Sequence, residues 1–452
     1  MGIQVWQPAN VLWFEWLAAA LVLVFAGWSL RSQGVVEEMH RRGTAIRRGG
    51  RRRRRCKLTL AGTGIAFADE ARHFKLLGTT GTGKSTAIAE LMGGALGRAD
   101  RAVFTDPDGG YLQRFYERER GDVVLNPFEP GTYKWDLFAE IREPYDVEQL
   151  ASGLIPNCSD GNAQEWRGYA RTLLSAVLRR CYLTGNHDTA ELWRLLVRGT
   201  SKELRSAVAG SPAQPFLEGE NARMFASIRS VMISSIAALE HVQAQRAPHC
   251  SIRDWMSSGR GVLFLPYRAA QIAALRSIIA TWTRLAIFAA MARPDESRCL
   301  WFVIDELDAL GAIEGLKDAL TRLRKFGGRC VLGMQSIAQV SSTYGAGEAQ
   351  TIIENCANTL ILRCSGSENG GTSNFASRLI GEREVIRKQT SLSRDGDRWF
   401  GARAGRRSTV TSRQHVTELA VMASEIEQLP DFQGYLKTAS SPHWLRVALP
   451  LN

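Results

Sequence analysis

A glycine-rich run between Gly78 and Ser85 carries the residue types that bind phosphate. Its sequence, GTTGTGKS, fits the pattern G-x-x-x-x-G-K-[ST], and the flanking residues predict a strand over 73–77 and a helix over 86–96. Glycines in such a turn let several backbone N–H groups point inward at the positive end of the following helix, which forms an anion site. A plain turn is the alternative, but a plain turn does not require a lysine followed by a serine.

We expect this run to bind the phosphates of ATP. Lys84 can reach the outer phosphates, and the hydroxyl of Ser85 can be a ligand of Mg²⁺. The expected nucleotide-binding residues are Gly78, Thr79, Thr80, Gly81, Thr82, Gly83, Lys84, Ser85 and Thr86.

Two acidic residues follow an apolar run later in the chain. The segment CLWFVIDE, 299–306, predicts a buried parallel strand that delivers Asp305 and Glu306 to its carboxyl end. In a nucleotide hydrolase Asp305 would help to hold Mg²⁺, and Glu306 would orient or deprotonate the attacking water. The tripeptide IDE alone is common and predicts little. The prediction is stronger here because a phosphate-binding run precedes it in the same chain.

Other polar side chains also follow predicted strands. Asp106 begins the turn DPDGG after a strand over 101–105, where it could contact a ligand or simply shape the turn. Gln335 follows a strand over 329–334, at a position suited to sensing the γ-phosphate.

The predicted helix over 311–326 ends with three basic residues, Arg322, Arg324 and Lys325. Cations at a helix C-terminus are stabilised by the helix dipole, which is reason enough for them to occur there. Alternatively, one of them reaches the nucleotide of a neighbouring subunit as an arginine finger.

The positive charge of the chain is concentrated near the N-terminus. The formal net charge is +12, and residues 31–55 hold ten arginines against two glutamates. The rest of the chain is therefore only mildly basic, so bulk charge does not predict DNA binding. The eight cysteines and seven histidines show no C-x-x-C or H-E-x-x-H spacing, which argues against a zinc site and favours reduced thiols.

An apolar segment over 11–30 has the length of a membrane-spanning helix. Trp13, Trp16 and Trp28 suit the membrane interfaces, and the arginines after the segment place the rest of the chain in the cytoplasm. A cleaved signal peptide and a buried helix are the alternatives. The arginine run could also bind anionic lipid or nucleic-acid phosphates, although a role in setting topology is favoured. The apolar helix expected over 271–291 contains Arg276 and Arg284, which favours a core helix over a second span.

The order of these signals predicts an α/β fold with a mostly parallel central sheet. Helical periodicity over 162–185, 189–197, 201–209 and 222–239 predicts an all-α inserted domain. Residues 365–371 and 394–407 are expected to be exposed loops. We expect these segments: 1–32, transmembrane anchor; 33–55, arginine-rich juxtamembrane segment; 56–139, first part of the nucleotide-binding domain; 140–258, all-α insert; 259–452, second part of the nucleotide-binding domain.

Several motifs together resemble the coupling ATPases of type IV secretion and conjugation, the TraD/TrwB-like group of the FtsK/HerA-type P-loop superfamily. They are HFKLLGTTGTGKST, DPDGG, NPF with WDLF, FVIDELDAL, LRKFGGRCVLGMQS and SEIEQLPDFQGYL. The resemblance covers roughly 56–440. It implies RecA-like domains in a homo-hexameric ring, anchored in the bacterial inner membrane. Many members have two spans enclosing a small periplasmic part, whereas this sequence shows one.

The resemblance also implies the activity, the partners and the site. The activity would be DNA-dependent ATP hydrolysis that moves single-stranded or duplex DNA, or nucleoprotein, from a relaxase complex into a secretion channel. Lys84 and Ser85 would bind phosphate and Mg²⁺, and Asp305 and Glu306 would be the metal-assisting and catalytic acids. Arg324 would be the arginine finger, and Gln335 the sensor.

Three other functions share some of these sequence features. A DNA translocase of the FtsK/HerA kind shares the chemistry, but little sequence follows the last core strand to form a DNA-reading domain. A nucleotide-binding adaptor that recruits substrates with little turnover would not need Glu306. An ABC-type ATPase is disfavoured because no LSGGQ-like signature is present.

Overall fold

The computed structural model describes residues 37–49, 57–158, 161–218, 221–292, 299–367, 370–394 and 407–450. The chain divides into two compact units, one of Met1–Ala45 with Ile380–Ala420 and one of Ile46–Leu379 with Val421–Asn452. The expected membrane span over 11–30 lies outside the described residues. The five expected segments remain a prediction.

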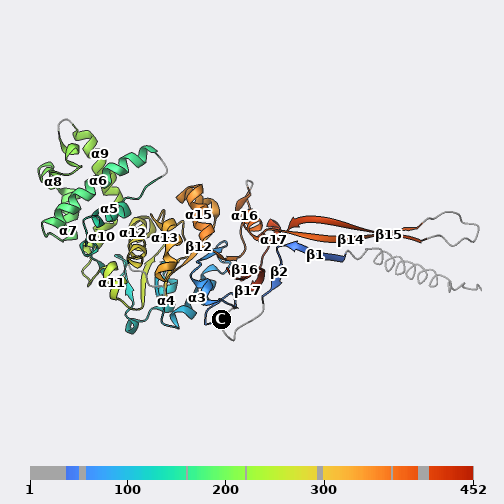
Figure 1. The fold of residues 1–452 in the computed structure, drawn as a ribbon. Coiled ribbons are helices and arrows are strands. Elements are labelled where there is room, and N and C mark those ends of the chain that lie inside the picture. The colour runs from blue at the N-terminus through green and yellow to red at the C-terminus, as the bar shows by residue number, and fades with distance from the viewer. Residues whose placement is uncertain are drawn as a thin grey trace, which may run out of the picture. The chain divides into compact units, whose positions relative to one another are not determined.

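A mixed, mostly parallel sheet forms the centre of the larger unit (Figure 1). In their order across the sheet, the described strands are β2 (Ile46–Arg48), β17 (Trp444–Ala448), β16 (Gln433–Lys437), β13 (Asn358–Ile361), β5 (Phe74–Leu77), β12 (Gly328–Met334), β11 (Leu300–Ile304), β6 (Arg101–Pro107), β10 (Val262–Tyr267) and β7 (Val123–Val124). Each pair of adjacent strands between β13 and β7 is parallel, while β16 is antiparallel to both β13 and β17. The predicted α/β class is therefore confirmed.

The apolar strands are buried because helices cover both faces of the sheet. Every residue of β10, β11 and β12 is buried, as expected of parallel strands. Helices α3 (Lys84–Leu96) and α4 (Gly110–Phe115) pack on one face around Phe74, Phe104 and Trp301. Helix α12 (Ile272–Ala290) packs against β6 and β10 and contacts α13 (Leu316–Arg322). The carboxyl ends of the parallel strands thus meet at one edge of a rigid core.

Outside the stretch between β7 and β10, the other elements of this unit are short. They are α2 (Phe67–Glu70), η1 (Arg118–Arg120), η4 (Leu323–Phe326), α14 (Ile337–Tyr344), α15 (Ala346–Asn355), α16 (Gly371–Ile380) and α17 (Ala423–Glu427), with the hairpin β3 (Thr59–Leu60) and β4 (Thr63–Gly64). The helix expected over 311–326 is confined to α13 and η4.

Helix α12 is a core helix despite its apolar length. Among the described residues it is the one continuous helix that could span a membrane by length and composition, but 61% of its apolar stretch is buried within the protein. Its Arg284 donates to the backbone oxygen of Gln149 and lies 5.0 Å over the ring of Phe288. The buried arginine thus has protein partners, which agrees with the prediction of a core helix.

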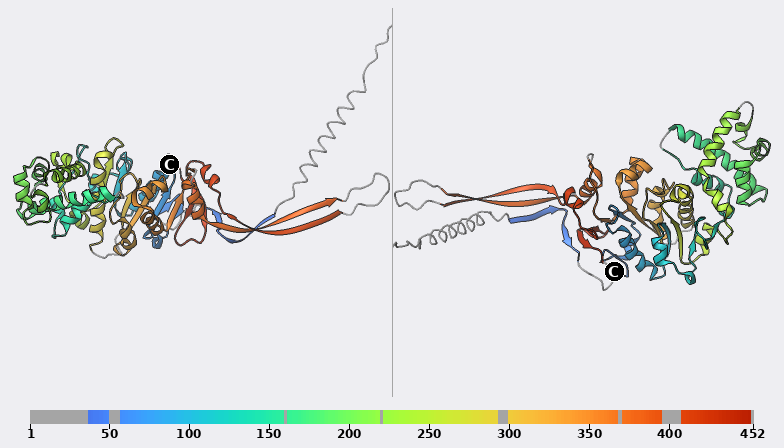
Figure 2. Two further views of the ribbon diagram at one scale, coloured as in Figure 1. Left: turned by 90° about the horizontal axis from the view of Figure 1, so that it is seen from above. Right: turned by 180° about the vertical axis from the view of Figure 1, so that it is seen from behind.

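Helices dominate the chain between β7 and β10. They are η2 (Phe138–Glu140), α5 (Asp146–Leu154), α6 (Gly161–Leu183), α7 (Thr189–Arg198), α8 (Ser201–Val208), η3 (Gln214–Leu217), α9 (Ala222–Ser235), α10 (Ala238–Ala244) and α11 (Ile252–Ser258). In Figure 2 the green helices of this stretch group at one end of the larger unit. The single helix expected over 222–239 is wrong, because the chain bends by 62° between α9 and α10.

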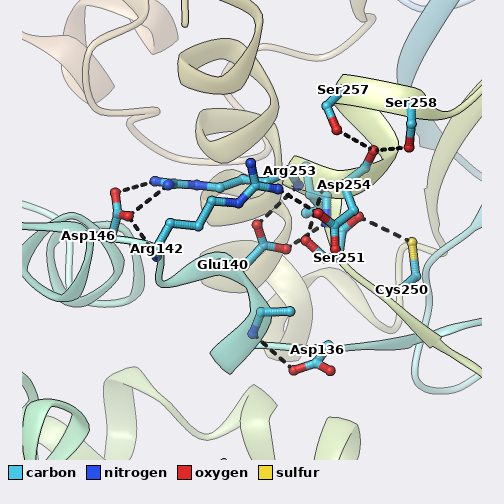
Figure 3. A network of polar contacts seen from close by, with 12 residues as sticks. Asp136, Glu140, Arg142, Asp146, Cys250, Ser251, Arg253, Asp254, Ser257 and Ser258 are labelled. Carbon is cyan, nitrogen blue, oxygen red and sulfur yellow. Dashed lines mark hydrogen bonds and ion pairs between the residues drawn. The ribbon is translucent and has the colours of Figure 1, made fainter. Parts of the chain in front are cut away.

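A polar network joins the strands and helices where the chain enters and leaves this helical stretch (Figure 3). Strand β8 (Lys134–Trp135) pairs with β9 (His249–Cys250), and the buried Glu140 accepts from the backbone N–H groups of Ile252 and Arg253, at 2.6 and 3.1 Å. Arg253 donates to both oxygens of Asp146, whose side chain is fully buried. The two segments that lead into and out of the helical stretch are therefore held together by side-chain contacts as well as by the pairing of β8 with β9.

Replacing Asp146 by asparagine is expected to destabilise this junction by about 3 kcal/mol, because Arg253 would lose the charge that compensates its burial. Asp254→Asn is the matched control, since the Arg142–Asp254 pair belongs to the same network but is 48% and 64% exposed. The control should lose less than about 1 kcal/mol. Hydrogen exchange of peptides covering 134–146 and 249–258 measures the difference; equal protection in the two variants would contradict this account.

The smaller unit is a sheet of charged strands that the sequence patterns did not predict. β14 (Glu382–Arg394) and β15 (Arg407–Leu419) form an antiparallel hairpin, and β1 (Glu37–Gly43) pairs with β14. Arg41 and Arg42 both donate to Glu384 and lower its pKa to about 2, and Arg383 bonds Glu418 at 2.7 Å. The arginine-rich segment 33–55 thus contains strands β1 and β2, and the segment 394–407, expected to be a loop, begins and ends in strand residues.

Candidate nucleotide-binding site

The phosphate-binding run is a tight loop between β5 and α3, and its glycines are required by space and conformation. Gly83 has a φ of 108°, and a Cβ at this position would lie 2.9 Å from the ring of Phe432. A Cβ on Gly78 would lie 2.8 Å from Oγ1 of Thr82 and 2.9 Å from Cβ of Leu362. Only glycine fits at these two positions without displacing the neighbours.

Bonds within the loop hold it in this shape. The hydroxyl of Thr82 donates to the backbone oxygen of Thr79 at 2.7 Å, and the N–H of Thr79 donates to the oxygen of Arg363 at 2.9 Å. Lys84 is buried, and its ammonium donates to the backbone oxygens of Gly78 and Thr79, at 2.6 and 3.2 Å. Burial lowers the pKa of Lys84, while Asp305 and Glu306 oppose the change. The ammonium therefore lies at the loop, beside the N-terminus of α3.

The end of β11 brings the two acids to this loop. The hydroxyl of Ser85 donates to Oδ2 of Asp305 at 2.6 Å, and the hydroxyl of Tyr111 donates to the same oxygen at 2.7 Å. Burial and the nearby Asp305 raise the pKa of Tyr111, so its hydroxyl keeps the proton that it donates. The parallel sheet thus joins the lysine-bearing loop to an acid far along the chain.

The residues around Asp305 fit a hydrated Mg²⁺ ion. Oδ1 of Asp305 is buried and has no hydrogen-bond partner among the described residues. Its carboxylate therefore keeps acceptor capacity, and the hydroxyl of Ser85 lies beside it. Oxygen donors of this kind, with room for water and phosphate, are those that Mg²⁺ prefers.

Glu306 is linked to the loop through Gln335. The amide nitrogen of Gln335 donates to Oε1 of Glu306 at 2.6 Å, and its oxygen accepts from the hydroxyl of Thr80 at 3.2 Å. Burial and the charge of Asp305 raise the pKa of Glu306, while the bond from Gln335 opposes the change. A raised pKa brings a carboxylate closer to the basicity that suits a general base.

These side chains line one pocket of about 550 Å³. The predicted residues that line it are Thr79, Thr80, Gly81, Gly83, Lys84, Ser85, Thr86, Asp305, Glu306 and Gln335. Gly78 and Thr82 are not in the wall; they shape the loop beneath it.

Two candidates lie elsewhere. Arg324 is an exposed residue of η4 and does not line the pocket of its own chain. Asp106 also does not line the pocket, because its carboxylate accepts from the backbone N–H groups of Tyr111 and Leu112, at 3.0 and 2.6 Å. Of the two interpretations of Asp106, the structure favours the one in which it shapes the turn.

Seven residues of the pocket wall were not predicted as site residues: Ala89, Pro107, Asp108, Gly110, Tyr111, Arg114 and Phe432. Tyr111 and Arg114 belong to α4, and the turn DPDGG before this helix was the available signal. Phe432 comes from the segment between α17 and β16, has a φ of 61°, and donates its N–H to the oxygen of Thr82 at 3.0 Å. Only the motif PDFQGYL marked this segment, and nothing in it indicated a position beside the loop.

This chain is similar to a known protein family over most of its length. Residues 57–450 match the family model described as "Type IV secretion-system coupling protein DNA-binding domain". The chain is a type IV secretion-system coupling protein. The resemblance to the TraD/TrwB-like group is confirmed.

Known relatives of this coupling protein agree with that assignment. The coupling protein TraD of Escherichia coli (strain K12) is 29% identical over 377 residues, which cover 81% of this chain and 51% of TraD. The chain thus spans about half the length of that relative. The unbound, monoclinic form of the conjugative coupling protein TrwBdeltaN70 is 32% identical, with a TM-score of 0.79 over 92% of this chain and 94% of that one.

A further solved structure, of TrwB with ADP and Mg²⁺, is similar to this coupling protein over almost the whole chain. It is 31% identical, and its TM-score is 0.80 over 93% of this chain and 96% of that one. The α/β fold of this coupling protein, with its mixed, mostly parallel sheet, is therefore similar to the fold of TrwB.

Proposed function

We propose that this coupling protein is a membrane-anchored, DNA-dependent ATPase. Hydrolysis of ATP would recruit and pump DNA or nucleoprotein into a type IV secretion or conjugation channel. The proposal rests on one observation above all: Lys84, Ser85, Asp305, Glu306 and Gln335 lie around one pocket. The TrwB structure with ADP and Mg²⁺ supports a nucleotide in this pocket.

Different residues of this pocket would have different roles in the transfer of the γ-phosphoryl group to water. Backbone N–H groups of the loop and the ammonium of Lys84 bind the phosphates, and Lys84 would exchange its bonds to Gly78 and Thr79 for phosphate oxygens. Ser85 and Asp305 would hold Mg²⁺, which when bound would neutralise charge on the phosphates. Glu306 would orient the attacking water and accept its proton.

Gln335 lies where it could respond to the presence of a γ-phosphate in the pocket. It bonds Thr80 of the loop on one side and Glu306 on the other. A γ-phosphate between these groups would compete for the same hydrogen bonds. We therefore assign Gln335 the role of sensor.

The partners are proposed from the family and from the sequence. They are DNA, relaxase or relaxosome proteins, components of the secretion channel, and five further copies of the chain in a homo-hexameric ring. The segment 11–30 would cross the bacterial inner membrane once and leave the folded part in the cytoplasm.

The test is ATP turnover by the full chain in detergent, with no DNA, with single-stranded DNA and with duplex DNA, at two salt concentrations. We expect DNA to stimulate turnover and the stimulation to weaken as salt rises, because phosphate contacts are screened. Binding of ATP without turnover in any condition would favour the nucleotide-binding adaptor instead. An FtsK/HerA-like translocase would pass this test but would not support transfer of DNA between cells.

Arg324→Ala is expected to abolish turnover in the assembled ring while leaving nucleotide binding to each subunit intact, because an arginine finger acts on the neighbouring site. Arg322→Ala is the matched control, since Arg322 is also exposed in the preceding turn. Mixed rings of Arg324→Ala and Glu306→Gln subunits provide the measurement. If the turnover of the mixed rings equalled the average of the turnover of the two variants measured separately, the result would contradict a site shared between subunits. If Arg322→Ala lost turnover and Arg324→Ala did not, Arg322 would be the arginine finger.

A further inference from the structure

The side chain of Tyr111 reaches the acid assigned to Mg²⁺ from an element outside the nucleotide-binding motifs. Tyr111 lies in the first turn of α4, is 4% exposed, and donates its hydroxyl to Oδ2 of Asp305 at 2.7 Å. Ser85 donates to the same oxygen from α3, at 2.6 Å. Oδ2 therefore receives two hydroxyl donors from two different helices, while Oδ1 receives none.

The position of Tyr111 is fixed by contacts that do not involve Asp305. Its backbone N–H donates to Oδ1 of Asp106 at 3.0 Å, and Asp106 belongs to strand β6 of the central sheet. Its ring packs against Phe104, with ring centres 5.2 Å apart. The hydroxyl is thus held by the core of the sheet and by the start of α4.

A fixed donor of this kind controls the orientation of a carboxylate. The last torsion of an aspartate side chain is broad, so an unbonded carboxylate samples many orientations. Groups that bond the acids around a metal ion determine how those acids face the ion, and losing one commonly weakens metal binding 10- to 100-fold. Ser85 is the expected metal ligand itself and belongs to the phosphate-binding run, so it is not an independent support for Asp305.

We infer that Tyr111 is a positioning residue of the Mg²⁺ site, whose hydroxyl holds Asp305 in the orientation that receives the ion together with the nucleotide. This inference rests on the proposed binding of ATP and Mg²⁺ and assigns a role that the nucleotide motifs leave open. The alternative is that Tyr111 is only part of the pocket wall. A wall residue contributes to nucleotide binding with or without the metal ion, whereas a positioning residue contributes only when the ion is present.

The experiment measures binding of a fluorescent ATP analogue, mant-ATP, to the full chain in detergent, first in EDTA and then at increasing MgCl₂. Tyr111→Phe keeps the ring and removes the hydroxyl. We expect its affinity for mant-ATP in EDTA to equal that of the parent, and its Mg²⁺ midpoint to rise roughly 10-fold. Tyr116→Phe is the matched control, because Tyr116 follows the same helix with a side chain that is 47% exposed, and it should leave both values unchanged.

A double-mutant cycle tests whether Tyr111 acts through Asp305. If it does, Tyr111→Phe adds nothing to the midpoint of Asp305→Ala, because the group that it positions is gone. Additive effects, an unchanged Mg²⁺ midpoint in Tyr111→Phe, or an equal loss of affinity in EDTA would each overturn the inference while leaving the proposed ATPase intact. A parent chain that bound no mant-ATP under either condition would overturn the proposed function and this inference with it.

Discussion

Turnover of ATP is expected to fall on the order of 100- to 1,000-fold when Lys84 is replaced by alanine, because the transition state loses a charged donor aimed at the phosphates. Binding of nucleotide should weaken by about 1.5 to 3 kcal/mol, the usual value of a hydrogen bond to a charged group. Turnover by the full chain and titration with a fluorescent ATP analogue give the two numbers.

The protein fold is expected to tolerate Lys84→Ala. Burial already lowers the pKa of Lys84, and its bonds to Gly78 and Thr79 lie within one loop. Lys202→Ala is the matched control, since Lys202 is exposed on α8 and distant in sequence from the pocket. Parental turnover in a folded Lys84→Ala protein would refute the assignment of the phosphate-binding loop.

Glu306→Gln should separate binding from hydrolysis. The amide keeps the size of the side chain and can still accept from Gln335, but it cannot take a proton from water. We expect turnover to fall on the order of 100- to 10,000-fold while nucleotide affinity stays near the parental value. A single-turnover measurement with radiolabelled ATP distinguishes slow hydrolysis from slow product release.

Glu354→Gln provides the matched control for Glu306→Gln. Glu354 is an exposed glutamate of α15 that also accepts from a glutamine, with Nε2 of Gln350 at 2.7 Å. It should leave turnover unchanged. A Glu306→Gln protein that hydrolysed ATP at the parental rate would show that another group activates the water, and the pocket would then need a different general base.

Local signals were sufficient for the core of the fold and for most of the candidate site. The apolar runs before Gly78 and Asp305 predicted β5 and β11, because parallel strands buried on both faces read as continuous apolar segments. The lysine and the acids could be predicted to meet because the carboxyl ends of parallel strands share one edge. The position of Gln335 after β12 followed from the same rule.

Contacts between segments that are distant in the chain could not be predicted from the sequence. Tyr111 is an ordinary aromatic residue in a short helix, and its bond to Asp305 depends on how α4 packs against the sheet. Phe432 reaches the loop because β16 adds to the sheet beside β13. Periodicity gives no information on either arrangement, since both depend on tertiary packing.

The hairpin of β14 and β15 was missed for a different reason. The described side chains of β15, from residue 411 onward, are mostly exposed, so they lack the alternation of apolar and polar side chains by which strands are recognised. Its charges instead pair across strands, as in Arg383 with Glu418. Cross-strand pairs of this kind can be recognised only once the pairing register is known.

The pairing of β1 with β14 determines where the N-terminal apolar segment can be removed without exposing a strand edge. A truncation starting at residue 56 would remove β1 and leave the backbone groups of 383–388 that face it without partners. It would also remove the ion pairs of Glu384 with Arg41 and Arg42. A bare strand edge is a template for self-association, so such a version is expected to form aggregates through this edge. A cut that retains residues from 37 onward keeps the three strands together.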